Sequence, residues 1–269
     1  MKFNLKHIFT VAVTASALIL SGCGDKETNQ NTIKVGVIAG AETQVAEIAA
    51  KVAKEKYNLD VELITFTDYV TPNAALDDGS VDVNAFQHKP YLDQQIKDRG
   101  YKLAIAGNTF VYPIAGYSKK IKSLDELKEG DRIAVPNDPT NLGRSLLLLQ
   151  QQGLITLKDD AGLLATVRDI TANPKKIKIV ELDAAQLTRS LDDMALSIIN
   201  TTFASSINLA PQRDGLFVEG KESPYVNLIV ARKENVNDQN VQNFVKAYQT
   251  EAVYQGAAKI FNDGVVKGW

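Results

Sequence analysis

The sequence is poor in the residues that most enzymes and metal proteins use for their chemistry. It contains one cysteine, Cys23, and two histidines, His7 and His88, among 269 residues. A single cysteine excludes an intramolecular disulfide, and no His/Cys cluster has the spacing of a zinc site. Phosphate-binding glycine loops, nucleophile elbows and His-Glu-x-x-His helices are also missing. We therefore expect no enzyme activity, no metal and no cofactor, although a Ser–His–Asp arrangement depends on spatial proximity and stays open.

The first segment is typical of an export signal. Lys2 and Lys6 precede an apolar run over residues 8–20, which is shorter than the roughly 20 residues that span a membrane. Such a start, followed by small residues, predicts a secretory signal peptide at residues 1–22. It ends in a Leu-Ser-Gly-Cys tetrad that resembles the bacterial lipobox. The resemblance implies that Cys23 carries lipid chains, palmitate among them, and anchors the protein to a membrane.

The rest of the chain is mildly acidic. The whole sequence has a net charge of −2, and removal of the signal peptide takes away two lysines. No basic patch remains, so nucleic acid is not expected as a partner. Residues 23–32 are polar and unpatterned, which predicts a flexible tether between the lipid and the folded part.

Strand-like and helix-like segments alternate through the folded part. The expected strands are 33–38, 61–66, 81–86, 101–106, 109–117, 132–136, 177–182, 194–199 and 225–231. The expected helices are 41–57, 73–78, one that begins near Pro90, 141–152, 159–170, 184–193 and 236–261. This alternation predicts an α/β fold with mostly parallel sheets. We expect two lobes, joined by crossover strands near 109–116 and 225–230.

The first candidate site is an aromatic segment at the end of a strand. Phe86, His88 and Tyr91 lie where a predicted strand gives way to a helix, and Tyr69 follows the preceding strand. Taken singly, these residues fit an ordinary core or a structural histidine. Because α/β proteins bind ligands where strand ends meet at a cleft, the group favours an apolar box for a ligand.

The second candidate is the segment 136–145, which joins a strand to an apolar helix. Free N–H groups at a helix start favour an anion such as a carboxylate. Arg144, expected in the first turn with Asn141 at its start, can add a bidentate charged pair. The alternative is a solvated surface charge, which fits poorly because arginine at a helix start opposes the helix dipole.

The third candidate is a pair of asparagines. Asn200 ends a predicted strand, and Asn227 lies within apolar strand sequence, where an amide is unfavourable unless it is paired. The alternative role is to satisfy backbone groups at a strand end. Two amide oxygens also suit an ammonium group. Anion clamp, ammonium acceptors and aromatic box together describe a site for a zwitterionic amino acid with an apolar tail.

At these residues the chain closely resembles the NlpA family of lipoproteins, specifically the methionine-binding receptors of methionine ABC importers. The match covers essentially the whole chain, from the lipobox to the C-terminus. The segments that carry it are IKVGV at 33–37, NAFQHKPYL at 84–92, GNTFVYP at 107–113, VPNDPTN at 135–141, NTT at 200–202 and SPYVN at 223–227.

The resemblance implies a two-lobed periplasmic-binding-protein fold, with lobe 1 at 33–110 and 229–269 and lobe 2 at 111–228. It implies a monomeric receptor in the bacterial cell envelope, anchored by lipid and facing the periplasm or the outer surface of the cytoplasmic membrane. Its partners would be L-methionine and an ABC importer permease with its ATPase.

The same resemblance gives each candidate residue a role. The thioether chain would be enclosed by Tyr69, Phe86, His88 and Tyr91, since sulfur–aromatic contacts suit that task. The carboxylate would be bound by Arg144 and Asn141, and the amino group by Asn200 and Asn227.

One segment departs from the family's pattern. The connection between residues 190 and 195 is shorter than in the family, which puts the contact made by Asn200 in question. Alternative ligands are D-methionine, N-formylmethionine and a methionine-containing dipeptide. Alternative functions are a non-transport envelope adhesin or scaffold, and an exported hydrolase that uses His88.

Overall fold

The computed structural model describes residues 31–220 and 223–269. The predicted signal peptide, the lipidation site Cys23 and nearly all of the predicted tether lie outside these residues. The first strand, β1, begins at Thr32, one residue earlier than predicted. Within the described ranges, no helix combines the length and the apolar character needed to cross a bilayer.

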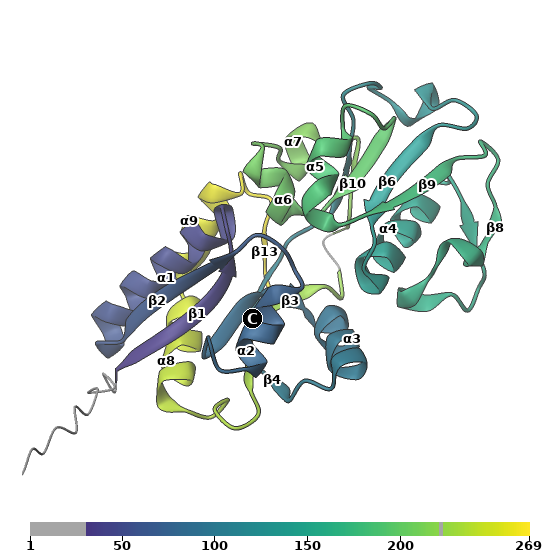
Figure 1. Ribbon diagram of the computed structural model, residues 1–269. Helices are drawn as coiled ribbons and strands as arrows, with labels where there is room; N and C mark the ends of the chain where they lie inside the picture. Colours follow the sequence, from purple (N-terminus) through teal and green to yellow (C-terminus); the bar gives the residue numbers. More distant parts are fainter. Residues whose placement is uncertain (1–30, 221–222) are drawn as a thin grey trace, which may run out of the picture. The chain divides into compact units, whose positions relative to one another are not determined.

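The first of two large sheets, with its helices, forms what we call lobe 1, residues 31–111 and 226–269 (Figure 1). Its strand order is β13 (Val266–Lys267), β4 (Leu103–Val111), β12 (Val226–Arg232), β3 (Val83–His88), β1 (Thr32–Ile38) and β2 (Asp60–Phe66). Strand β1 is parallel to β2 and β3, whereas β12 is antiparallel to β3 and β4.

The helices of lobe 1 cover both faces of this sheet. On one face lie α1 (Ala41–Tyr57), α8 (Gln239–Tyr248) and α9 (Glu251–Ile260), and on the other α2 (Thr71–Asp77) and α3 (Lys89–Arg99). Strand β12 shows the division, because Ile229 and Ala231 pack with the first group while Leu228 and Val230 pack with the second. A strand buried on both faces has the continuous apolar sequence seen here.

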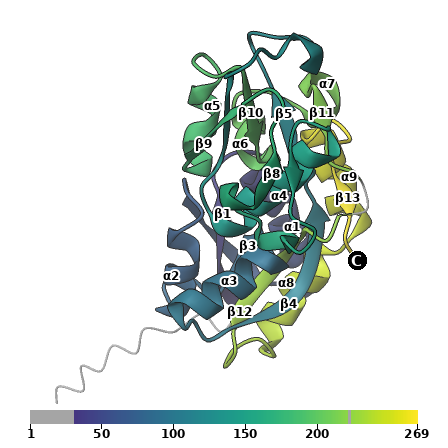
Figure 2. The same cartoon turned by 90° about the vertical axis from the view of Figure 1, so that its right-hand side faces the viewer.

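The second sheet forms lobe 2, residues 112–225. Its strand order is β11 (Phe217–Val218), β5 (Ala115–Tyr117), β10 (Leu196–Ile199), β6 (Arg132–Pro136) and β9 (Lys178–Leu182). Its helices are α4 (Pro139–Gln151), α5 (Leu187–Ser190), α6 (Thr201–Ser206) and α7 (Pro211–Asp214). Two short strands, β7 (Thr156–Leu157) and β8 (Ile170–Ala172), form a small separate ladder. Figure 2 shows β4 and β12 of lobe 1 below β5, β10 and β11 of lobe 2.

The chain passes between the sheets twice. Residues 112–114 lead from β4 to β5, and residues 219–225 lead from β11 back to β12. The two-lobed α/β fold with two crossovers is therefore confirmed. We place the lobe boundaries at these crossovers, because the predicted boundaries at 110/111 and 228/229 fall inside β4 and β12. The apolar pattern of the sequence predicts a strand but does not show in which of the two sheets that strand pairs.

The helix predicted over 159–170 is wrong. The segment contains the 3-10 turns Gly162–Leu164 and Val167–Asp169. Gly162 adopts a φ of +61°, which a helix does not contain. Asp169 accepts hydrogen bonds from both the backbone N and the Oγ1 of Thr166 and so closes a separate turn.

Two other predicted helices are shorter than expected. The helix over 184–193 is a 3-10 turn, Ala184–Gln186, followed by the short α5, and the helix over 236–261 is divided into α8 and α9.

Candidate functional site

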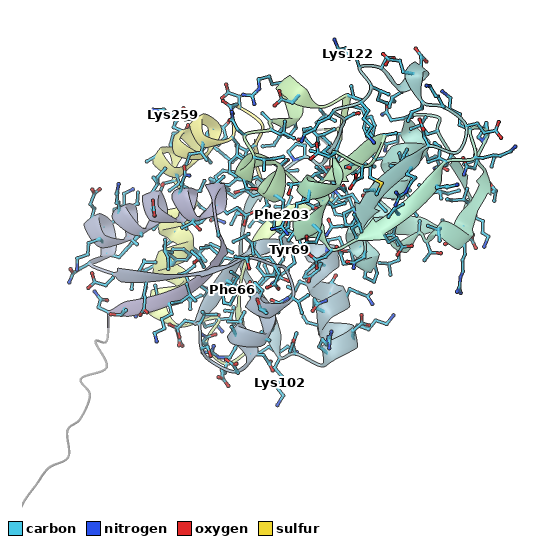
Figure 3. The ribbon with its side chains drawn as sticks, turned by 45° about the horizontal axis from the view of Figure 1, so that its top comes forward. Phe66, Tyr69, Lys102, Lys122, Phe203 and Lys259 are labelled. Atoms are coloured by element: carbon cyan, nitrogen blue, oxygen red, sulfur yellow. The ribbon has the colours of Figure 1, made fainter. Side chains whose placement is uncertain are left out.

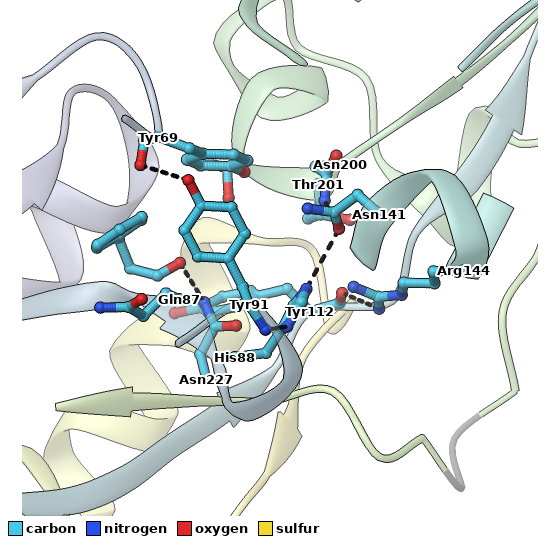
Figure 4. Close-up of a pocket in the computed structure, with 12 residues that line it drawn as sticks. Tyr69, Gln87, His88, Tyr91, Tyr112, Asn141, Arg144, Asn200, Thr201 and Asn227 are labelled. Atoms are coloured by element: carbon cyan, nitrogen blue, oxygen red, sulfur yellow. Dashed lines mark hydrogen bonds between the residues drawn. The ribbon is translucent and has the colours of Figure 1, made fainter. Parts of the chain in front are cut away.

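A pocket lies where the two lobes meet (Figure 4), and its empty space of about 350 Å³ includes the solvent at its opening. All of the predicted ligand-binding residues line it, together with four residues that the sequence did not single out. The lining consists of Tyr69, Phe86, Gln87, His88, Tyr91, Tyr112, Asn141, Arg144, Asn200, Thr201, Thr202 and Asn227. The structure therefore brings together residues that are far apart in the sequence, and their roles toward a ligand stay predictions.

The pocket forms at strand ends, as the α/β architecture predicts. Strand β3 ends at His88, β6 ends at Pro136 just before α4, and β10 ends at Ile199 just before Asn200. Strand β12 runs in the opposite direction, so its beginning lies at the same edge. Its Asn227 pairs with His88 in the β3–β12 ladder.

One side of the pocket is made of rings from lobe 1, namely Tyr69, Phe86, His88 and Tyr91, which we call the aromatic wall. The ring of Tyr69 lies 5.8 Å from that of Phe86 and 6.2 Å from that of Tyr91, measured between centroids. Tyr91 Oη donates a hydrogen bond of 2.7 Å to the carbonyl oxygen of Tyr69. Phe203 of lobe 2 closes the group, with its ring 4.8 Å from that of Tyr69 (Figure 3).

His88 is a neutral hydrogen-bond donor at this site. Its Nδ1 caps α3 by accepting a 3.2 Å hydrogen bond from the backbone N of Tyr91, so its proton resides on Nε2. Nε2 lies 3.2 Å from Asn141 Oδ1 and donates to it. Burial, reinforced by the positive charge of Arg144, lowers the pKa of His88 to about 3. The imidazole is therefore uncharged at neutral pH.

Asn141 joins the lobes and has both ends of its amide occupied. Its Oδ1 accepts from His88 and, at 3.0 Å, from Nδ2 of Asn200. Its Nδ2 donates to Oδ2 of Asp138 at 2.9 Å. The amide nitrogen carries a second N–H, so the predicted role of Asn141 as a carboxylate donor does not require it to leave Asp138.

The start of α4 differs from the prediction. The helix begins at Pro139, so Arg144 lies beyond its first turn. Asp138 caps the helix by accepting hydrogen bonds of 2.9 Å from the backbone N of Asn141 and from Oγ1 of Thr140. The backbone N–H of Asn141 is consequently not free for a ligand carboxylate. Arg144, the cationic residue of the pocket lining, is the remaining candidate to bind it.

Arg144 is buried and held on three sides. Its Nε donates a 2.8 Å hydrogen bond to Oε1 of Glu219, and its Nη2 donates to Oε2 of the same carboxylate. Nη2 also donates to the carbonyl oxygen of Tyr112 at 3.1 Å. The guanidinium carbon lies 4.2 Å from the centre of the Tyr225 ring. Among the residues that the structure describes, Nη1 has no hydrogen-bond partner, which leaves one donor edge for an anion.

The two remaining predicted residues offer amide oxygens. Nδ2 of Asn227 donates to the carbonyl oxygen of Phe86 at 2.9 Å, which fixes the direction of its Oδ1. Oδ1 of Asn200 is buried and has no hydrogen-bond partner within the described part of the chain. Such an acceptor costs about 1–3 kcal/mol unless a donor satisfies it. The short connection before β10 does not prevent the strand from forming, and Asn200 lies in the pocket.

Sequence reasoning missed a buried contact between the lobes beside the pocket. Thr202 of α6 donates a 2.5 Å hydrogen bond from Oγ1 to Oε1 of Glu42 at the start of α1. Burial raises the pKa of Glu42 to about 8, with the hydrogen bond from Thr202 acting in the opposite direction. An acidic residue in the first turn of a helix is common on protein surfaces, so nothing in the sequence marked Glu42 as buried.

Sequence reasoning also missed Glu219, which holds Arg144, and the pocket residues Gln87, Tyr112, Thr201 and Thr202. Within residues 31–220 and 223–269, no group of three or more His, Cys, Asp or Glu side chains is arranged to hold a metal ion.

Comparisons with known proteins agree with this geometry. Residues 33–269 match the family model described as NlpA lipoprotein. A relative from Vibrio cholerae, named probable D-methionine-binding lipoprotein MetQ, is 76% identical over 269 residues, which cover 100% of both chains.

Solved structures share the fold as well. A crystal structure of the methionine-binding protein MetQ superposes with a TM-score of 0.89 at 70% identity, over 89% of this chain and 99% of that one. A nutrient-binding protein from Burkholderia cenocepacia, solved bound to methionine, superposes with a TM-score of 0.86 at 51% identity, over 88% of this chain and 100% of that one. The resemblance inferred from the sequence is thereby confirmed, and the chain belongs to the NlpA lipoprotein family.

Proposed function

We propose that this protein is a lipid-anchored receptor that binds methionine between its two lobes and delivers it to an ABC importer. The observation that carries the proposal is the composition of one pocket. A buried arginine, an amide oxygen without a partner and an aromatic wall line the same cavity. These groups match the carboxylate, the ammonium group and the thioether tail of methionine. The relatives named for methionine binding support the same ligand.

Each end of the ligand has its own partner in this proposal. The carboxylate binds the free Nη1 edge of Arg144, where a charged hydrogen bond is stronger than a neutral one. The ammonium group donates to Oδ1 of Asn200 and Oδ1 of Asn227. The thioether lies against Phe86 and its neighbours in the aromatic wall, because sulfur packs well at the edges of rings. Binding from both lobes favours hinge closure.

The anchor and the cellular location belong to the same proposal. The export signal and the tetrad ending at Cys23 support a location on the outer side of a membrane, facing the periplasm. A short polar segment separates Cys23 from β1, so the receptor stays near the membrane that holds its permease. We infer a binding protein without catalytic activity, since the pocket pairs His88 with amides and not with a nucleophile.

Calorimetric titration of the purified lipoprotein in detergent tests the ligand. L-Methionine is expected to bind at one site with a dissociation constant in the micromolar range or below. L-Alanine is the matched control, because it carries the same charged groups without the thioether. The same two ligands are then compared for the melting temperature, which a ligand of the folded state raises. Absence of heat and of a melting shift with methionine would contradict the proposal.

D-Methionine is a second candidate ligand, favoured by the name of the Vibrio cholerae relative. The two enantiomers carry the same three groups but arrange them with opposite hand around the α-carbon. Because Arg144, Asn200 and the aromatic wall come from separate elements, the pocket can match all three groups of one enantiomer at a time. Titration with each enantiomer decides between them, and the tighter of the two is the ligand.

A further inference from the structure

Arg144, the proposed partner of the ligand carboxylate, is already paired with a carboxylate of the protein. Glu219 and Arg144 form a two-point ion pair in which the Arg144 side chain is 4% exposed and that of Glu219 13%. Glu219 lies at the start of the second crossover, and its Oε2 also accepts from the backbone N of Ile114 in the first crossover, at 3.4 Å. The position of its carboxylate is thus fixed by both connections between the lobes.

Among the ionisable groups around the pocket, the Arg144–Glu219 pair determines the charge balance of the pocket. His88 is neutral, because its pKa is about 3, and Glu42 is mostly protonated at neutral pH, because its pKa is about 8. Asp138 is turned into the first turn of α4, where it accepts hydrogen bonds from Asn141 and Thr140. The positive charge of Arg144 is therefore compensated by Glu219 before any ligand arrives.

We propose that Glu219 determines the charge specificity of the pocket: by neutralising Arg144 it makes the site favour a zwitterion over an anion with the same tail. This inference rests on the proposed function. A zwitterion brings no net charge into the closed pocket. An anion that lacks the ammonium group brings one uncompensated negative charge, whose burial is costly. It also leaves the oxygen of Asn200 without a donor.

Glu219 also fixes the orientation of the Arg144 guanidinium. Its carboxylate binds Nε and Nη2, which turns the remaining Nη1 edge away from Glu219. The bidentate geometry restricts the guanidinium to one plane over the Tyr225 ring. Glu219 therefore both positions Arg144 and compensates its charge. Different variants of Glu219 distinguish these two effects.

The test compares two ligands on the full-length lipoprotein in detergent. L-Methionine and 4-(methylthio)butanoate share the thioether tail and the carboxylate, and only methionine carries the ammonium group. Calorimetry measures both dissociation constants for the wild type and for Glu219→Gln, which keeps the size of the side chain and removes its charge. The wild type is expected to prefer methionine by roughly 100-fold or more, and Glu219→Gln to narrow this ratio by roughly tenfold.

Two further variants separate charge from geometry. Glu219→Asp keeps the charge on a shorter side chain, so both affinities fall while the ratio stays within about threefold of the wild type. Glu234→Gln is the matched control, because Glu234 pairs with Arg232 at 3.1 Å on the surface, where its side chain is 79% exposed. This control is expected to leave the ratio unchanged. Thermal unfolding of each variant verifies that it is folded.

The outcomes distinguish this inference from the proposed function. If methionine does not bind the wild type, the proposed function fails. If methionine binds but Glu219→Gln leaves the ratio unchanged, the role of Glu219 is structural and the inference is overturned. If Glu219→Gln does not fold, the remaining proteins decide: equal affinity of the wild type for both ligands, or a narrowed ratio in Glu219→Asp, overturns the inference as well.

Discussion

The two sides of the pocket are built in different ways. The aromatic wall comes from lobe 1, and its rings pack against one another and against apolar residues of lobe 2, Phe203 among them. The opposite side, from lobe 2, consists of Asn141, Arg144 and Asn200, whose side chains bond to groups outside their own elements. In the proposed complex the tail of the ligand therefore meets rings that come mainly from lobe 1 and that Phe203 of lobe 2 closes. Its charged end meets groups whose positions depend on both lobes and on the crossovers.

This difference predicts unequal effects of mutation, and the largest is expected at Arg144. Arg144→Ala removes the cationic partner of the carboxylate and weakens methionine binding by roughly 100-fold or more. It also leaves the buried Glu219 without its partner, which lowers the free energy of unfolding by about 3–5 kcal/mol. Arg213→Ala is the control, because Arg213 pairs with Asp214 on the surface of the same lobe. A dissociation constant for Arg144→Ala within threefold of the wild type would contradict the role of Arg144 as the carboxylate partner.

The stability of the protein is expected to depend on pH through Glu42, which contacts Thr202 across the two lobes. The pKa of Glu42 is about 8 in the folded protein and 4.5 in the unfolded chain, so the folded state binds more protons between these values. The free energy of unfolding should therefore fall as pH rises from about 4.5 to 8, on the order of a few kcal/mol, and level off above that range. Chemical denaturation across this range measures it.

Glu42→Gln is expected to flatten that profile, whereas Glu62→Gln, at an exposed position on β2, should keep it. His88 acts in the opposite direction, because its lowered pKa reduces stability as pH falls from 6.5 toward 3. Each variant is for this reason compared with the wild type at the same pH. A Glu42→Gln profile identical to that of the wild type would show that the Glu42–Thr202 contact is not a buried neutral pair.

Asn200 is a proposed ammonium acceptor on the polar side of the pocket. Asn200→Ala removes one acceptor for the ammonium group, so methionine binding should weaken by roughly tenfold. Binding of 4-(methylthio)butanoate should change by less than about threefold, since it has no ammonium group to lose. Asn243→Ala on α8 is the control, because its side chain bonds to Gln239 on the same helix. Equal losses for both ligands would remove Asn200 from the ammonium site.

Phe86 gives the smallest expected effect, on the aromatic side. Phe86→Leu keeps an apolar surface and removes a ring, so methionine binding should weaken by roughly fivefold through lost sulfur–aromatic contact. Binding of norleucine, which has a methylene in place of the sulfur, should weaken less. Calorimetry with the two ligands measures the difference. An equal loss for both would indicate that the wall contributes apolar area alone.

The same contrast explains what the sequence could predict. The aromatic wall is nearly local, since Phe86, His88 and Tyr91 lie within one strand-to-helix segment, and a local pattern is visible in the sequence. The partners on the polar side are distant in the sequence: Glu219 lies 75 positions after Arg144, and Asn200 lies 59 positions after Asn141. Glu219 follows a two-residue strand, where no periodicity indicates which side chain it meets.

Secondary structure shows the same limit. The bounds of α1 were predicted correctly, because its apolar residues repeat at helical spacing between Gly40 and an Asn58 that adopts a left-handed conformation. The false helix over 159–170 was predicted as a continuation of helix-like sequence. There Leu163 and Leu164 are 43% and 45% exposed while Ala165 is buried in the lobe 2 core, so the apolar residues do not form one buried helical face. Periodicity predicts a helix reliably only where tertiary packing uses it.

The position of the ligand sulfur shows whether the thioether and the carboxylate bind at opposite sides of the pocket. Crystals are grown from protein that contains ordinary methionine, with selenomethionine as the ligand. All selenium located by anomalous diffraction then belongs to the ligand. The two-sided pocket predicts one strong peak among the rings of Tyr69, Phe86 and Tyr91, with the ligand carboxylate on Arg144. A peak beside Arg144, or no peak between the lobes, would contradict it.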